Sequence, residues 1–198
     1  DPSAAARDPE NRLLHRLPPR RLEAEEVRDT MLSVSGRLDR TLGGPSVPMH
    51  LTEFLTGRGR PGKSGPLDGD GRRSIYLEIR RNFLSPFLAS FDFPVPFSTV
   101  GKRSVSNVPA QSLARMNDPF VHQQAQVWAG RILDAGLTSD RARVAQMVRE
   151  AYGREPLTGE LHLLLEFLAE SPDRARWKDL AHALFSSQEF IFLESGVE

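Results

Sequence analysis

The chain has 198 residues, in which 26 Lys and Arg side chains balance 26 Asp and Glu side chains, and it contains no Cys. This length can bury a core without disulfides or metal, and the missing Cys excludes thiolate catalysis, Cys-ligated zinc and covalent c-type haem within this chain. The zero net charge argues against a nucleic-acid-binding protein, and there is no run of about 18 apolar residues that could span a membrane.

The N-terminal third is expected to hold an extended segment followed by one long helix. Residues 1–17 lack an initiator Met and the apolar core of a signal peptide, which is typical of a trimmed boundary inside a larger protein. A helix is predicted from Arg20 to Leu42, because apolar residues recur at steps of three and four before Gly43 ends the pattern. The apolar stripe consists of Ala24, Val27, Met31, Val34 and Leu38, and the outer face carries Glu23, Glu25, Glu26, Arg28 and Asp29.

Residues 57–73 change in character. Six Gly and two Pro occupy this segment, Leu67 is its only large apolar residue, and five basic residues outnumber two acids. Such a composition buries too little apolar area to offset the entropy of ordering. We therefore predict a flexible Gly/Arg surface loop, and the functional alternative is a loop that binds a polyanion.

The middle of the chain is expected to be irregular. Residues 74–79 alternate weakly and contain β-branched and aromatic residues, which indicates one short strand or extended segment. Five Phe and three Pro follow between Phe83 and Phe97. Prolines at this density prevent a long helix, whereas the aromatic side chains require burial, so this segment is predicted to be irregular and anchored by its Phe residues.

The last ninety residues predict a helical bundle over residues 109–193. Helices are expected from Pro109 to Met116, after the Asp118-Pro119 pair, after Thr138 or Ser139, after Thr158, and from Ser171-Pro172-Asp173 onward. The fold class is therefore mainly α, with the long N-terminal helix packed on this bundle in a single domain of residues 1–198.

The density of arginine around the aromatic segment is the most unusual feature of the sequence. Guanidinium groups bind carboxylate, sulfate or phosphate in a bidentate manner, and aromatic rings offer platforms for sugars. The candidate contacts for an anionic ligand are Arg72, Arg73, Tyr76, Arg80, Arg81 and Arg103. The alternative is internal ion pairing, in which Glu23, Glu25, Asp29, Glu78 and Asp92 neutralise these arginines and hold the loops to the first helix.

No motif predicts a catalytic residue or a metal site. The sequence has no phosphate-binding glycine loop, nucleophile elbow or paired-histidine zinc motif, and its five His are scattered. Glu78 and Asp92 could act as an acid/base pair only if folding brought them within about 5–10 Å. Asp118 is explained as a helix cap, and Glu189 as a surface or inter-helix hydrogen-bonding group.

Ten short runs, in the same order along the chain, carry a resemblance to a known family. They are residues 20–29, 33–39, 43–47, 72–76, 91–94, 101–105, 109–113, 117–121, 153–156 and 177–184. From about Asp8 to Leu193, the chain resembles the C-terminal domain of planctomycete cytochrome-c-associated surface proteins, domain of unknown function 1553. The resemblance implies an exported, periplasmic or cell-surface setting, with haem c carried by a separate module of the parent protein and no cofactor in this chain.

The resemblance and the missing motifs together predict a non-catalytic binding or docking domain of a larger exported, haem-associated protein. Acidic or sulfated polysaccharide is the expected ligand class, and the other domains of the parent protein are the expected partners. One alternative is that the chain contributes part of a hydrolase or oxidoreductase active site completed by missing N-terminal domains, for which a deep cleft lined by Glu78, Asp92 and the arginines would be the sign. Another alternative is a structural spacer without a ligand.

Overall fold

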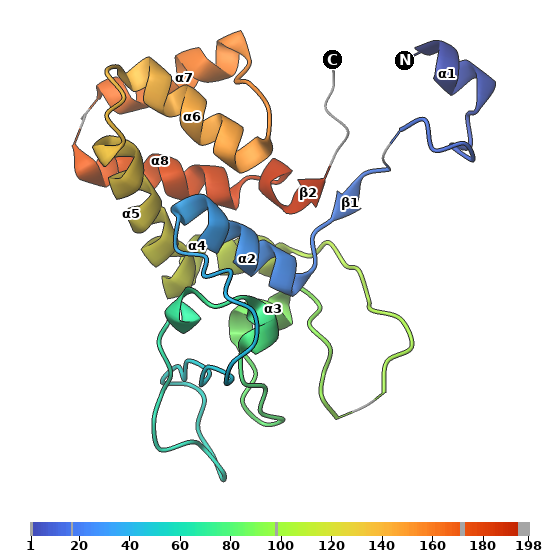
Figure 1. Cartoon of the computed structure of the whole chain (residues 1–198), viewed down its shortest axis with the longest axis vertical. Helices are drawn as coiled ribbons and strands as arrows, with labels where there is room; N and C mark the ends of the chain where they lie inside the picture. Colours follow the sequence, from blue (N-terminus) through green and yellow to red (C-terminus); the bar gives the residue numbers. More distant parts are fainter. Residues whose placement is uncertain (1, 17, 98, 171–172, 194–198) are drawn as a thin grey trace.

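The computed structural model describes residues 2–16, 18–97, 99–170 and 173–193, and it is mainly α-helical (Figure 1). Two-residue strands, β1 (Arg20–Arg21) and β2 (Phe192–Leu193), pair antiparallel and join the two ends of the domain. The α-helices are α1 (Pro2–Arg7), α2 (Ala24–Ser35), α3 (Pro86–Ser90), α4 (Pro109–Asn117), α5 (Pro119–Asp134), α6 (Asp140–Tyr152), α7 (Thr158–Ala169) and α8 (Arg174–Ser186), and the 3₁₀ turns are η1 (Gly69–Gly71), η2 (Ser74–Tyr76) and η3 (Glu189–Ile191).

Helix α5 forms the centre of the molecule, where it packs against both α8 and α2. Trp128 on α5 is fully buried, and its ring lies 4.9 Å from that of Phe185 on α8. On the other side of α5, Met31 and Leu32 of α2 are equally buried. One continuous cluster of buried side chains runs from α2 through α3 to the bundle, so the N-terminal helix packs on the C-terminal bundle as expected.

Local capping signals determine where most helices of the bundle begin and end. The Asp118 carboxylate accepts the Phe120 N–H at the start of α5, and the Ser139 hydroxyl accepts the Ala142 N–H at the start of α6. Asp173 caps α8 in the same way, and Gly153 ends α6 in the left-handed conformation. These four positions confirm the predicted boundaries, except that residues 171–172 lie outside the described residues.

The long N-terminal helix is shorter than predicted. Helix α2 starts only at Ala24, because Arg20 and Arg21 pair with β2. It ends at Ser35, because Gly36 takes a left-handed φ of 81° and its N–H bonds to the preceding turn. The N-terminal segment, predicted to be extended over residues 1–17, is not purely extended in its described part, residues 2–16. Helix α1 occupies residues 2–7, and the Asp8 carboxylate then accepts the backbone N–H groups of residues 12 and 13.

The middle of the chain differs from the prediction in two places. Residues 74–79 form no strand; η2 occupies residues 74–76, and Leu77 makes only an isolated bridge to Val47. The Phe/Pro segment includes the short helix α3, which Ser85 caps and Pro86 opens. Phe87 and Phe91 anchor this segment in the core, as expected.

The segment expected to be one flexible loop, residues 57–73, has two different parts. Residues 57–60 and 62–64 are exposed, whereas Asp68, Gly69 and Gly71 are buried against α2. The second part is ordered because the Gly71 carbonyl accepts the Asp39 N–H at 2.8 Å, and because buried polar groups of α2 bond to its backbone. Composition alone did not show these long-range bonds.

Candidate functional site

Arg103, one of the predicted anion contacts, is engaged in an ion-pair cluster with the start of α2. Its guanidinium lies 2.8 Å from a Glu23 carboxylate oxygen and 2.7 Å from Glu25. The hydrogen bonds to Glu25 raise the pKa of Arg103. The internal-pairing alternative is therefore correct for Arg103, which holds the loop after α3 against α2.

Arg72 and Tyr76 form a second internal contact. The Arg72 guanidinium stacks 4.1 Å from the centre of the Tyr76 ring and donates to the Gly43 carbonyl. The Tyr76 hydroxyl in turn accepts the Gly43 N–H, and Asp39 lies 3.8 Å from Arg72. These groups close the loop between α2 and η2, so neither predicted contact is free to bind an anion without rearrangement.

The remaining predicted arginines are more accessible. Arg80 pairs with Glu78 at 2.6 Å while its side chain stays 45% exposed. Arg73 and Arg81 are exposed, and their side chains have no ion-pair or hydrogen-bond partner among the residues the structure describes. The fold thus divides the predicted set of six into three engaged residues and three accessible ones.

The two carboxylates considered as an acid/base pair have separate partners. Asp92 lies 2.6 Å from the buried Arg21 and accepts both the backbone N–H and the hydroxyl of Ser106. Burial opposes ionisation of Asp92, but the Ser106 and Arg21 hydrogen bonds prevail and lower its pKa. Glu78 pairs with Arg80 instead, so the structure does not bring Glu78 and Asp92 together as an acid/base pair.

Cationic side chains gather at one end of the molecule, which we call the distal tip and define as residues 52–64 and 80–82. Its two loops project from the same end of the molecule, away from α6 and α7 (Figure 1), and a small hydrophobic cluster of Met49, Leu51 and Phe83 joins them. The distal tip has one carboxylate, Glu53, and five cationic residues, which are Arg58, Arg60, Lys63, Arg80 and Arg81. Phe54, on the first of these loops, is 91% exposed.

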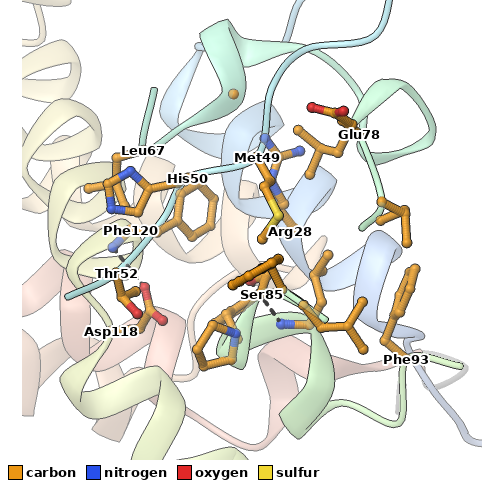
Figure 2. A pocket seen from close by; sticks show the side chains of 18 of the residues that line it. Arg28, Met49, His50, Thr52, Leu67, Glu78, Ser85, Phe93, Asp118 and Phe120 are labelled. Carbon is orange, nitrogen blue, oxygen red and sulfur yellow. Dashed lines mark hydrogen bonds between the residues drawn. The ribbon is translucent and has the colours of Figure 1, made fainter. Parts of the chain in front are cut away.

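Behind the distal tip, a cavity of about 90 Å³ opens between α2, the segment 77–88 and the start of α5 (Figure 2). Its walls are largely apolar because the Phe-rich segment folds back onto α5. Six of the apolar lining residues are Leu67, Leu77, Phe83, Phe87, Phe93 and Phe120.

Polar groups enter the cavity from two sides. Arg28 and Glu78 lie on one side, and His50, Thr52 and Asp118 lie on the other (Figure 2). Burial raises the pKa of Asp118, although the Phe120 N–H bond and the nearby His50 oppose the shift. Asp118 is thus both the expected helix cap and a carboxyl group that faces a mostly apolar space.

The sequence analysis missed Arg28, His50 and Thr52 as members of a site. It placed Arg28 on the outer face of the first helix, but the side chain is buried and the assignment was wrong. The helical spacing contained the signal, since Arg28 lies four residues after Ala24 and three before Met31, both on the apolar stripe. No pattern in the sequence marks His50 or Thr52, because only the fold brings them to Asp118.

The described residues contain no group of three or more His, Asp or Glu that could hold a metal ion. None of the described helices combines the length and the apolar character that crossing a membrane requires.

The structure is thus a mainly α-helical domain with a cationic distal tip at one end and a small, largely apolar cavity behind it. Comparison with protein-family models identifies its family. The model described as PSD1, protein of unknown function (DUF1553), matches residues 1–168, and the chain belongs to this family. The matched region includes the distal tip and every residue that lines the cavity.

Searches of curated proteins and of solved structures found no match to the chain. The family model thus confirms the resemblance found in the sequence motifs, at the level of the family.

Proposed function

We propose that this domain is a non-catalytic binding domain of a larger exported, haem-associated protein and that it recognises acidic or sulfated polysaccharide. The single observation that carries the proposal is the distal tip, where two neighbouring loops carry five cationic side chains, one carboxylate and an exposed Phe54, and where only Arg80 has an ion-pair partner among the described residues, Glu78. In this proposal haem c belongs to another module of the parent protein.

The chemistry of the distal tip suits a repeating anion better than a single small one. Arg58, Lys63 and Arg81 project from exposed loops, so several sulfate or carboxylate groups along one chain could be contacted at once. Guanidinium groups bind such oxyanions in a bidentate manner, and an exposed aromatic ring provides a face for a sugar. Arg73 is also exposed and remains part of the candidate set.

Affinity electrophoresis through gels that contain dextran sulfate tests the proposal, with neutral dextran as the reference. The wild-type domain is expected to be retarded by dextran sulfate and to be released as salt rises, because screening weakens exposed charge interactions. The triple variant Arg58→Ala, Lys63→Ala, Arg81→Ala should lose most of this retardation.

A matched control removes the same charge elsewhere. Arg12, Arg16 and Arg141 are exposed and lie outside the distal tip, and their triple Ala variant should be retarded like the wild type. Equal loss in both triple variants would mean that only net charge matters, which contradicts a site at the distal tip. Absence of retardation of the wild-type domain at low salt would refute polyanion recognition itself.

A further inference from the structure

The polar side of the cavity has three groups with unused hydrogen-bonding capacity. The buried Thr52 Oγ1 has no hydrogen-bond partner among the described residues. The Asp118 carboxylate accepts the Phe120 N–H through Oδ1 at 2.9 Å. Its other oxygen, Oδ2, has no hydrogen-bond partner among the described residues and remains available. His50 bonds through Nδ1 to the Gly65 carbonyl at 3.1 Å, which leaves its Nε2 available.

Buried polar atoms without partners are rare in folded proteins, and they indicate a bound water, ion or ligand. Here the buried atom is Thr52 Oγ1. His50 of the same segment and Asp118 at the start of α5 lie on the same wall of the cavity, as Figure 2 shows. The oxygens of Thr52 and Asp118 can each accept a hydrogen bond, so this wall is suited to a donor.

The acceptor that remains free in the cavity favours a cation over an anion. The carboxylates Asp118 and Glu78 and the guanidinium of Arg28 line the cavity, and Glu78 already pairs with Arg80 at 2.6 Å. The Arg28 donors are directed at protein groups, with Nη2 bonded to the Asp68 carbonyl at 2.7 Å and Nη1 bonded to the Arg72 carbonyl and the Ser74 hydroxyl. Arg28 is therefore committed to the fold, whereas Asp118 is the charged group with a free acceptor.

The volume limits the size of the ligand. A cavity of about 90 Å³ is smaller than the apolar cavity of roughly 150 Å³ that binds benzene. An apolar body of about four carbon atoms fits such a space and would contact the rings of Phe83, Phe87 and Phe120, which line it.

We propose that this cavity binds a small primary ammonium group on a short apolar body, with the ammonium on Asp118 and Thr52 and the body against the phenylalanine wall. The cavity shares only Thr52 with the distal tip and none of its cationic residues, so this inference stands or falls independently of polysaccharide recognition.

Titration of the isotopically labelled domain with n-butylamine, followed by amide chemical shifts at neutral pH, tests the proposal. Butylamine is protonated under these conditions, and it should give saturable shifts at Thr52 and Phe120 with a dissociation constant in the millimolar range, as befits about five non-hydrogen atoms. 1-Butanol has the same body without the charge and should bind about tenfold more weakly, and butyrate should not bind.

Three variants separate the site from effects on folding. Asp118→Asn removes the charge but retains helix capping, because Asn caps as well as Asp, and it should reduce butylamine affinity about tenfold. Thr52→Val removes an unpartnered hydroxyl, so it should keep the thermal stability and still weaken binding. Asp173→Asn makes the same change at the cap of α8, remote from the cavity lining, and should bind like the wild type.

Several results would overturn the proposal. These are equal binding of butylamine and 1-butanol, binding of butyrate at least as tight as that of the amine, and unchanged affinity in both Asp118→Asn and Thr52→Val. The absence of saturable chemical-shift changes at Thr52 and Phe120 would also overturn the proposal, since the cavity would then hold only water.

Discussion

Arg28 is the residue whose replacement tests the architecture most directly. Its guanidinium donates to the carbonyls of Asp68 and Arg72 and to the Ser74 hydroxyl at distances between 2.7 and 3.1 Å. It also lies 5.5 Å from the centre of the Phe120 ring. This one side chain of α2 therefore makes three of the hydrogen bonds that hold residues 66–74 in place. We expect Arg28→Met, which keeps the apolar stem but removes every donor, to release that segment.

The expected cost follows from these contacts. Each buried carbonyl left without a partner costs about 1–3 kcal/mol. Burial lowers the pKa of Arg28, because the charged form is poorly solvated there, and removing the charge recovers part of that cost. The net expectation is a loss of about 3 kcal/mol in the free energy of unfolding, which for a domain of this size lowers Tm by about 6–12 °C.

Urea denaturation measures this loss, and Arg149→Met provides the matched control. Arg149 pairs with Glu155 on the surface, where the two side chains are 41% and 70% exposed, so its replacement should cost about 0–1 kcal/mol. Amide hydrogen exchange should show faster exchange in residues 66–76 of Arg28→Met alone. If Arg28→Met were no less stable than Arg149→Met, or if residues 66–76 kept their protection, the structural role assigned to Arg28 would be refuted.

Three further predictions concern the loops and the bundle. Gly71→Ala should destabilise the domain by more than about 2 kcal/mol. The reason is that Gly71 has a φ of 74° and that an added Cβ would lie 2.2 Å from the Arg37 carbonyl oxygen. A Tm equal to that of the wild type would contradict this prediction. Arg103→Ala should lower the free energy of unfolding by only about 1 kcal/mol, since the side chains of its ion pairs are partly exposed. It should nevertheless speed limited proteolysis within residues 99–106, and an unchanged cleavage rate would contradict the role of Arg103 in holding this loop. Burial lowers the pKa of His182, so the unfolded chain binds a proton at this residue more readily than the folded chain does. The wild type should therefore lose stability as pH falls below about 6.5, and His182→Gln should make stability less dependent on pH. Denaturation midpoints of the two proteins between pH 7.5 and 5 provide the test, and parallel curves would exclude His182 as the source.

The parts of the fold that the sequence predicted are those specified by neighbouring residues. Asp118-Pro119, Ser139 and Gly153 act within one helical turn, so their roles can be read without knowing the rest of the chain. The pairing of β1 with β2 joins residues more than 170 positions apart, and nothing in either two-residue strand marks it in advance. The same is true of η2, which forms because Ser74 bonds to Asp29 of α2 rather than to a neighbouring strand.

The candidate sites were only partly predictable for a related reason. Counting arginines identified a cation-rich region but not which guanidinium groups would find carboxylates, because Arg103 and Glu25 are 78 residues apart. The cavity depends on two segments far apart in the sequence, which bring His50 and Thr52 to the same wall as Asp118. Each of these residues has an ordinary local role or none, so only the tertiary structure reveals the group.

A neutral chain can still present a strongly cationic surface, and this one does so by separating its charges. Internal pairs such as Arg103 with Glu25 remove equal numbers of both signs from the surface. Glu166 on α7 and Asp179 on α8 are exposed and have no ion-pair partner among the described residues, and these helices lie far from the distal tip (Figure 1). At physiological salt the Debye length is about 8 Å, so acids at the bundle end do not cancel the potential of Arg58, Lys63 and Arg81. The zero net charge, from which the sequence analysis argued against nucleic-acid binding, describes the whole chain and does not exclude a polyanion at the distal tip. The salt concentration at which dextran sulfate releases the domain should therefore depend on those three residues rather than on overall charge.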